Sequence, residues 1–153
     1  MGVVENWRDS AAWARLVRPE DCPICTNGRP LDVLVEMRAS WATGQAEAAL
    51  PGYVCIVSKT HAIEPFELPE QERAAFWDDV MRAARATSSA TGAVKMNYAI
   101  YGNTIPHVHM RLFPRYPDDP YRGVHVAAQH SFHRTQEELG KLAEAIRMSI
   151  DPG

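Results

Sequence analysis

Residues 107–113 read His-Val-His-Met-Arg-Leu-Phe, and their polar and apolar side chains alternate from 107 to 112. A period of two is typical of a β-strand whose two faces meet different surroundings. We therefore predict a strand over 107–113 that carries His107, His109 and Arg111 on one face and apolar side chains on the other. A face with three basic residues is either solvated or lines a binding site, and the alternation alone leaves both open.

The rest of the chain predicts an α+β fold. Turns are expected at Asn27-Gly28 and Pro51-Gly52, where residues that favour turns interrupt the apolar segments. We expect helices at 9–17, 70–89 and 135–150, and further strands at 31–37, 40–47, 53–58 and 94–101. This order favours an antiparallel meander sheet of about five strands with a long helix and a C-terminal helix packed on it. A length of 153 residues, 46% of them hydrophobic, fits a single domain over 1–153.

Helix ends carry recognisable signals. Asp9 is a candidate N-cap, Pro69 stands near the first turn of the long helix, and Gly92 follows its last turn. Thr135 and Glu138 form the sequence pattern of a capping box. Within the long helix, residues at three- and four-residue intervals predict the buried face: Ala74, Trp77, Val80, Met81, Ala84 and Arg85.

Composition limits the classes of partner. The formal net charge is -3, so the chain has no overall basic field, and we expect no nucleic-acid partner. No apolar run approaches the roughly 20 residues that a membrane helix needs, so no membrane partner is expected. The first residues, Met1-Gly-Val-Val-Glu-Asn-Trp7, lack the pattern of a signal peptide. We therefore expect a cytoplasmic protein.

Three cysteines are an odd number for a disulfide framework. Cys22 and Cys25 form a C-x-x-C motif, which in a reducing compartment indicates metal or redox chemistry. A thioredoxin-type motif needs a helix directly after its first cysteine, and the residues around Cys25 do not predict one. Two thiolates with two imidazoles would make a closed structural zinc site. Cys55 lies in a continuous apolar run and is predicted to be a buried strand residue.

His109 has the chemistry of a nucleophile toward phosphorus. A neutral imidazole needs no strong base to activate it, and its N–P adduct stays labile to water. Such a histidine needs its other ring nitrogen fixed and needs donors around the phosphoryl oxygens. The loop Gly102-Asn103-Thr104 just upstream offers backbone N–H groups, an amide and a hydroxyl.

Two segments carry a family resemblance. Gly102-Asn-Thr-Ile-Pro-His-Val-His-Met-Arg-Leu-Phe-Pro-Arg115 resembles the signature of the histidine triad (HIT) family, His-φ-His-φ-His-φ-φ followed by Pro-Arg, where φ is an apolar residue. Pro51-Gly-Tyr-Val-Cys-Ile-Val-Ser-Lys-Thr-His61 resembles the family's Pro-Gly-His, strand and Pro-Lys-x-His element. Together with the helix that follows Glu67-Leu68, the resemblance covers about 21–116. It implies a HIT-like fold.

The resemblance also implies roles for single residues. The middle histidine of the triad, here His109, is the nucleophile that attacks the α-phosphate of a nucleotide and forms a covalent nucleotidyl-histidine. Asn103 and Thr104 match positions that contact the phosphate or the histidines. Zinc-containing relatives pair an N-terminal C-x-x-C knuckle, here at about 20–28, with two histidines, and by this match the structural zinc ligands are Cys22, Cys25, His61 and His107. A homodimer is also implied.

The departure from the signature is Arg111, which stands where the third histidine is expected. Arginine cannot shuttle a proton but can hold phosphoryl oxygens with its fork. The resemblance therefore favours a hydrolase of dinucleoside polyphosphates or nucleoside-phosphate conjugates, whose leaving groups are already stable anions. Two alternatives are a nucleotidyltransferase, since the similar uridylyltransferases also lack the third histidine, and a catalytically weak nucleotide-binding or regulatory protein.

Further candidates for the nucleotide site are less sharply defined. Trp41 lies on the strand where the family lines its nucleoside pocket, and Gln45 lies near a ribose- and phosphate-contacting position. Arg115 follows Pro114 and is either a contact for a distal phosphate or a solvated residue at the end of the strand. The remaining histidines match no family position and are expected to be solvated or in loops: His125, His130 and His133.

Overall fold

The computed structural model describes residues 6–126 and 130–150 and has the expected α+β architecture. Its main sheet is antiparallel, with strand order β1-β2-β4-β6-β5. The strands are β1 (Val33–Glu36), β2 (Ser40–Thr43), β4 (Val54–Ser58), β5 (Lys95–Ala99) and β6 (His109–Arg115). Because β6 lies between β4 and β5, the sheet departs from a simple meander in its last two strands.

Helices account for most of the remaining chain. The α-helices are α1 (Ser10–Leu16), α2 (Pro23–Asn27), α3 (Glu70–Thr91) and α4 (Gln136–Ile150), and the short 3-10 helices are η1 (Asn6–Arg8), η2 (Pro19–Asp21) and η3 (Pro65–Glu67). The predicted caps are confirmed: Asp9 accepts bonds from the first turn of α1, Gly92 ends α3 at φ 68°, and Thr135 and Glu138 exchange the two bonds of a capping box. Among the described residues, no helix is both long and apolar enough to cross a bilayer.

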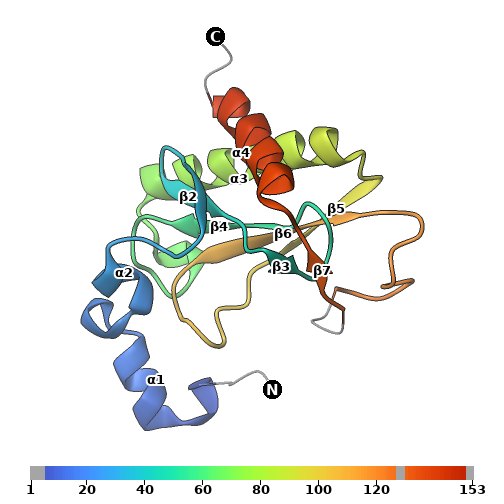
Figure 1. Ribbon diagram of the computed structural model, residues 1–153. Helices are drawn as coiled ribbons and strands as arrows, with labels where there is room; N and C mark the ends of the chain where they lie inside the picture. The colour runs from blue at the N-terminus through green and yellow to red at the C-terminus, as the bar shows by residue number, and fades with distance from the viewer. Residues whose placement is uncertain (1–5, 127–129, 151–153) are drawn as a thin grey trace.

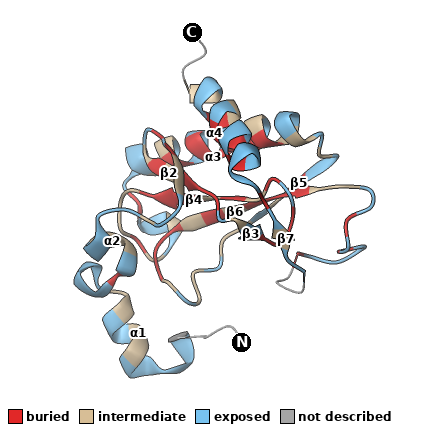
Figure 2. Cartoon of the chain, viewed as in Figure 1, coloured by how far each residue is buried: buried red, intermediate tan, exposed pale blue. Residues whose placement is uncertain are grey.

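The sheet separates a closed core from an open face. Helices α3 and α4 lie together on one side of it (Figure 1), where the buried side chains concentrate (Figure 2). Val54, Ile56, Met110 and Leu112 point to this helical side and are almost fully buried. The alternation predicted for the histidine strand therefore places His109 and Arg111 on the opposite, open face.

The buried face of α3 differs from the predicted one. Phe76, Val80 and Ala83 are fully buried, whereas Trp77 is 38% and Met81 is 46% exposed. Asp79 is buried instead, because its carboxylate accepts bonds from the Ala39 N–H and the Ser40 hydroxyl. Buried polar groups in proteins are almost always hydrogen-bonded in this way, and apolar spacing in the sequence does not reveal such a position.

Short elements also differ from expectation. The segment 40–47 splits, because β2 ends at Thr43 and β3 (Glu47–Ala48) pairs with β7 (Phe132–His133) in a separate two-stranded sheet. At Gly44, between β2 and β3, a Cβ would lie 2.7 Å from Cδ1 of Leu34, so a larger residue there would displace the Leu34 side chain. The histidine strand begins at His109 rather than His107, so His107 belongs to the loop that precedes it.

Candidate active site and metal site

Four residues from separate parts of the chain meet in one cluster. Cys22 precedes α2, Cys25 lies within α2, His61 follows β4, and His107 precedes β6. Their ligand atoms all lie within 4.8 Å of one another. The cluster joins the N-terminal knuckle to the start of the histidine strand.

Four of the six distances among these ligand atoms fit a tetrahedral zinc ion. Bonds of about 2.3 Å to sulfur and about 2.0–2.1 Å to nitrogen place tetrahedral ligand atoms roughly 3.3–3.8 Å apart. The distance from Sγ of Cys22 to Nδ1 of His107 is 3.4 Å, and the distances from Sγ of Cys25 to Nδ1 of His61 and of His107 are 3.3 and 3.7 Å. The two Nδ1 atoms lie 3.3 Å apart.

Backbone carbonyls orient both imidazoles. Nε2 of His107 lies 2.7 Å from the carbonyl oxygen of Ser58, and Nε2 of His61 lies 2.8 Å from that of Val17. Each Nε2–H therefore donates to a carbonyl, and each Nδ1 presents its lone pair to the cluster, as in metal sites generally. Burial and the neighbouring Cys22 raise the pKa of Cys25 to about 11, so thiolate formation there calls for a cation. Cys22, Cys25, His61 and His107 thus form a possible zinc site.

The segment after Cys22 differs from the expectation that no helix follows it. A short helix, α2, does follow Cys22 directly, so the absence of a helix is not an argument against a redox motif. The two nearby imidazoles are the stronger argument for a metal, because their lone pairs and the two sulfur atoms converge on one point.

His109 is held in one tautomer. Its Nδ1 lies 2.7 Å from the carbonyl oxygen of His107, so Nδ1–H donates and Nε2 keeps its lone pair. Burial lowers the pKa of His109, and the charge of Arg111 lowers it further, against the opposing effect of that hydrogen bond. The ring is therefore neutral and oriented, as nucleophilic attack requires.

A cavity of about 420 Å³ opens in front of His109. The open sheet face forms its floor, since Thr43 pairs with Cys55 and Cys55 pairs with Arg111. The knuckle and the following segment form an apolar wall that includes Ile24 and Leu31. The volume lies within the range of small-molecule sites.

Arg111 supplies positive charge in this cavity. Its guanidinium stacks on the ring of Tyr101 at 5.7 Å. Among the described residues it forms no hydrogen bond or ion pair, so its N–H donors remain available to an anion. The two predicted catalytic residues, His109 and Arg111, thus line the same cavity.

The other predicted binding residues are placed unequally. Gln45 lines the cavity. From the loop before His107, Ile105 lines it too, whereas Asn103 and Thr104 lie on the same loop but are not among the lining residues. Their phosphate contacts stay a prediction. Trp41 shares the open face but does not line the cavity, because it sits at the end of β2 with the ammonium of Lys59 5.8 Å from its ring. Its assignment to the nucleoside pocket stays a prediction.

The guanidinium of Arg115, a predicted contact for a distal phosphate, is bonded to protein groups. Its guanidinium bonds both carboxylate oxygens of Asp119, the amide oxygen of Asn97, and the carbonyls of Tyr121 and Val124. These contacts use all five N–H donors of an arginine. Arg115 therefore organises the loop after β6.

Several cavity residues were not singled out from the sequence. Tyr53, Cys55 and Val57 line the cavity from β4 and the residue before it. Cys55 lies in a strand as predicted but faces the cavity, half-buried. Because residues 53–57 form a continuous apolar run, no alternation in the sequence marks which of them face the cavity, and only the pairing of β4 with β6 shows it.

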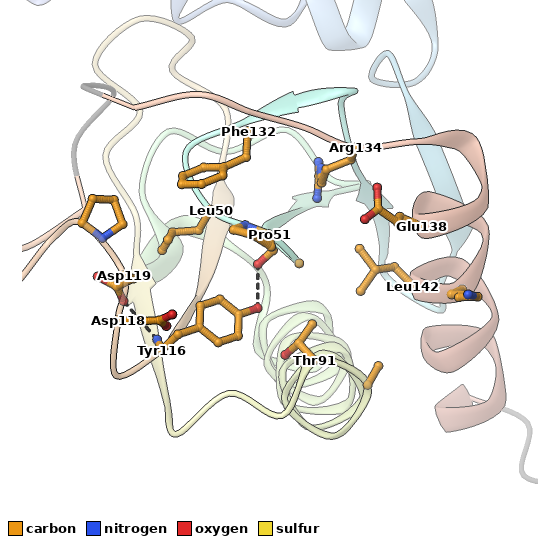
Figure 3. A pocket seen from close by; sticks show the side chains of 14 residues that line it. Leu50, Pro51, Thr91, Tyr116, Asp118, Asp119, Phe132, Arg134, Glu138 and Leu142 are labelled. Atoms are coloured by element: carbon orange, nitrogen blue, oxygen red, sulfur yellow. Dashed lines mark hydrogen bonds between the residues drawn. The ribbon is translucent and has the colours of Figure 1, made fainter.

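Another cavity, of about 460 Å³, lies between α3, α4 and the β3–β7 pair (Figure 3). Leu50, Phe132 and Leu142 give it apolar walls, and Tyr116 donates a 2.8 Å hydrogen bond to the carbonyl of Pro51 at its edge. It shares no lining residue with the cavity of His109.

Solved structures with the same fold are histidine triad proteins. One from Bradyrhizobium japonicum is 22% identical with a TM-score of 0.69, and the match covers 77% of this chain and 89% of that one. A zinc-bound histidine triad family protein from Mycobacterium smegmatis is 19% identical with a TM-score of 0.61, covering 88% and 96%. A protein from Sulfolobus tokodaii described as a hypothetical histidine triad nucleotide-binding protein is 19% identical with a TM-score of 0.61, covering 86% and 91%.

A search of curated proteins gives no match. The family model described as the HIT domain matches residues 27–118, which is more than half of the chain and includes two of the four zinc-site residues, His109 and the open cavity's floor. The chain belongs to the HIT domain family.

Proposed function

We propose that the protein is a nucleotidyl hydrolase that acts at the α-phosphate of a dinucleoside polyphosphate or nucleoside-phosphate conjugate. The observation that carries this proposal is the hydrogen bond from Nδ1 of His109 to the carbonyl of His107, in a cavity that also holds the uncommitted guanidinium of Arg111. Members of the family are often nucleotide hydrolases or transferases, which supports the same reading.

In the proposed reaction, Nε2 of His109 attacks the α-phosphorus. An N–P bond forms, the P–O bond to the leaving group breaks, and the leaving group departs as an oxyanion with the bonding electrons. Water then attacks the phosphorus, the N–P bond breaks, a proton passes to solvent, and His109 returns to its neutral form. Arg111 donates hydrogen bonds to the phosphoryl oxygens as charge develops on them.

Cys22, Cys25, His61 and His107 would hold the structural zinc. When bound, the ion supplies a cross-link and no acid-base chemistry in this proposal. Ile24 and Pro23 of the knuckle line the cavity, so these four residues position one wall of the nucleotide site.

Arg111 bears on the choice of substrate. An arginine does not give up a proton at neutral pH, so it does not act as a general acid for a poor leaving group. Phosphate-type leaving groups need no such proton. The same observation favours the second candidate, a nucleotidyltransferase, in which a phosphate of an acceptor replaces water.

The test is mass spectrometry of the full chain mixed with a panel of nucleotide conjugates. We expect wild type to release a nucleoside monophosphate and to show a nucleotidyl adduct, and His109→Ala to show neither. His125→Ala, which changes an exposed histidine outside this cavity, is the matched control and should behave as wild type. Binding without adduct or turnover would overturn the enzyme proposal and leave a nucleotide-binding protein.

Adding saturating acceptor phosphate separates hydrolysis from transfer. A hydrolase continues to release monophosphate. A transferase instead accumulates a new nucleotide conjugate, and that product would replace the hydrolase proposal by its alternative.

We also propose a homodimer through α3 and the sheet edge at β5. Trp77 and Met81 are exposed on α3, and Tyr98 of β5 is 44% exposed; apolar side chains of this size on neighbouring elements are typical of interfaces. A monomer by light scattering at micromolar concentration would contradict this.

For the compartment we propose the cytoplasm, where reducing conditions keep the C-x-x-C thiols available to a metal.

A further inference from the structure

The cavity of Figure 3 has no part in the proposed reaction. It measures about 460 Å³, within the roughly 300–1,000 Å³ of small-molecule sites. Figure 3 shows Phe132, Arg134 and Glu138 along one side and Tyr116 and Thr91 opposite them. Two aromatic rings with Leu50 and Leu142 give it room for an apolar group the size of a phenyl ring.

Arg134 is the one deeply buried cation among the described residues that line this cavity. It is 3% exposed. Its Nε and Nη2 donate to the carbonyl of Gln45, and its Nη1 donates to the carbonyl of Tyr53. An arginine has five N–H donors, so two of them have no protein acceptor within the described residues.

No described carboxylate neutralises Arg134 at ion-pair distance. Glu138 acts on the charge of Arg134 from beyond that distance, and its carboxylate accepts the Thr135 N–H of the capping box. Asp119 is engaged by Arg115. Burial lowers the pKa of Arg134, as expected for a cation that has lost water without gaining a full counter-charge.

We propose that this cavity binds a small carboxylate with an aryl or similarly sized apolar body, its carboxylate at Arg134. The two free N–H groups would donate to the carboxylate, and the apolar walls would hold the body. Asp118 and Glu138 at the rim disfavour ligands of higher negative charge, such as free phosphate. The match is therefore to a monoanion.

Arg134 also connects the two cavities. The carbonyls it holds belong to Gln45 and Tyr53, which both line the cavity of His109. A carboxylate on the two free N–H groups shares the guanidinium with these two carbonyls and so changes the hydrogen bonds to them. Ligand binding should therefore change the surroundings of Gln45 and Tyr53 at the edge of the cavity of His109.

The experiment is a titration of the full ¹⁵N-labelled chain with 3-phenylpropionate, followed by amide chemical shifts. We expect saturable shifts at Gly52, Thr91 and Leu142, and smaller ones at Gln45 and Tyr53. The uncharged 3-phenylpropanol should bind about tenfold to a hundredfold more weakly, since it lacks the charge-assisted hydrogen bonds. This comparison needs no variant.

Ala90→Trp places an indole in the cavity from the exposed side of α3 and should abolish the shifts, while Ser89→Trp, at an exposed neighbour outside the lining, should preserve them. No saturable shifts at the cavity, equal affinity for the alcohol, or unchanged binding in Ala90→Trp would overturn the proposal. Shifts at the cavity without any at Gln45 and Tyr53 would overturn the connection through Arg134. The same titration on His109→Ala should be unchanged, so the result does not depend on the proposed reaction.

Discussion

Replacing Asp119 by asparagine tests whether the Arg115–Asp119 pair is structural. Asp119 is 7% exposed and accepts hydrogen bonds from Arg115 and from the N–H groups of Tyr116 and Tyr121. The side-chain bonds from Arg115, followed by those two N–H groups, lower the pKa of Asp119 from 3.8 to about 2. With about 1.36 kcal/mol for each pKa unit, the difference of 1.8 stabilises the fold by about 2 kcal/mol.

The direction of the pKa shift of Asp119 determines the pH range in which this stabilisation is lost. The folded-state pKa lies below the unfolded one, so the stability is present above about pH 4 and disappears as the pH falls toward 2. At pH 7, the free energy of unfolding of Asp119→Asn should therefore be about 2 kcal/mol lower than that of wild type. At pH 3 the difference should be roughly half of that.

The assay is urea unfolding followed by tryptophan fluorescence, with both proteins measured at both pH values so that other acid-sensitive groups cancel. Asp118→Asn, at the exposed neighbour, should change stability by less than about 0.5 kcal/mol. A loss below 0.5 kcal/mol in Asp119→Asn, or one that does not depend on pH, would refute a structural role for the Arg115–Asp119 pair.

A second variant tests the position of Arg115. A nucleotide affinity that falls tenfold in Arg115→Met would place Arg115 in the phosphate site.

Three further predictions concern the sites and the core. Arg111→Met should weaken nucleotide binding by about tenfold to a hundredfold, because charge-assisted hydrogen bonds are lost; equilibrium dialysis checks this, and unchanged affinity would exclude Arg111 from the site. Removing the metal with a chelator should lower the melting temperature and weaken nucleotide binding together, because Ile24 of the knuckle lines the cavity; a lower melting temperature at constant affinity would separate the two. Asp79→Ala should cost about 1–3 kcal/mol in urea unfolding, because the buried Ser40 hydroxyl loses its acceptor, and a smaller loss would mean that water takes over this role.

The sequence carried much of the fold because its signals are local. Caps at Asp9, Gly92 and Thr135 lie within one turn of the helix ends that they fix, and the alternation after His107 defines a strand whatever it pairs with. The composition of the zinc site was likewise visible in a C-x-x-C motif and two histidines, once the resemblance to a family supplied the pairing. The chemistry of imidazole and amide groups made His109 and Asn103 candidates, and the resemblance gave each of them a specific role.

Tertiary structure decided the matters that depend on distant partners. Nothing in the sequence around Arg115 and Arg134 distinguishes them from exposed arginines. Only the structure shows that the loop after β6 holds Arg115 and that the carbonyls of Gln45 and Tyr53 hold Arg134. Asp79 is buried in α3 because Ala39 and Ser40 happen to face it across the fold. Local sequence patterns report the helix or strand propensity of a segment and which of its faces is apolar. The burial of a side chain, the register of a strand and the number of unused hydrogen-bond donors arise only when separate segments pack together. These three properties decide which residues reach the site.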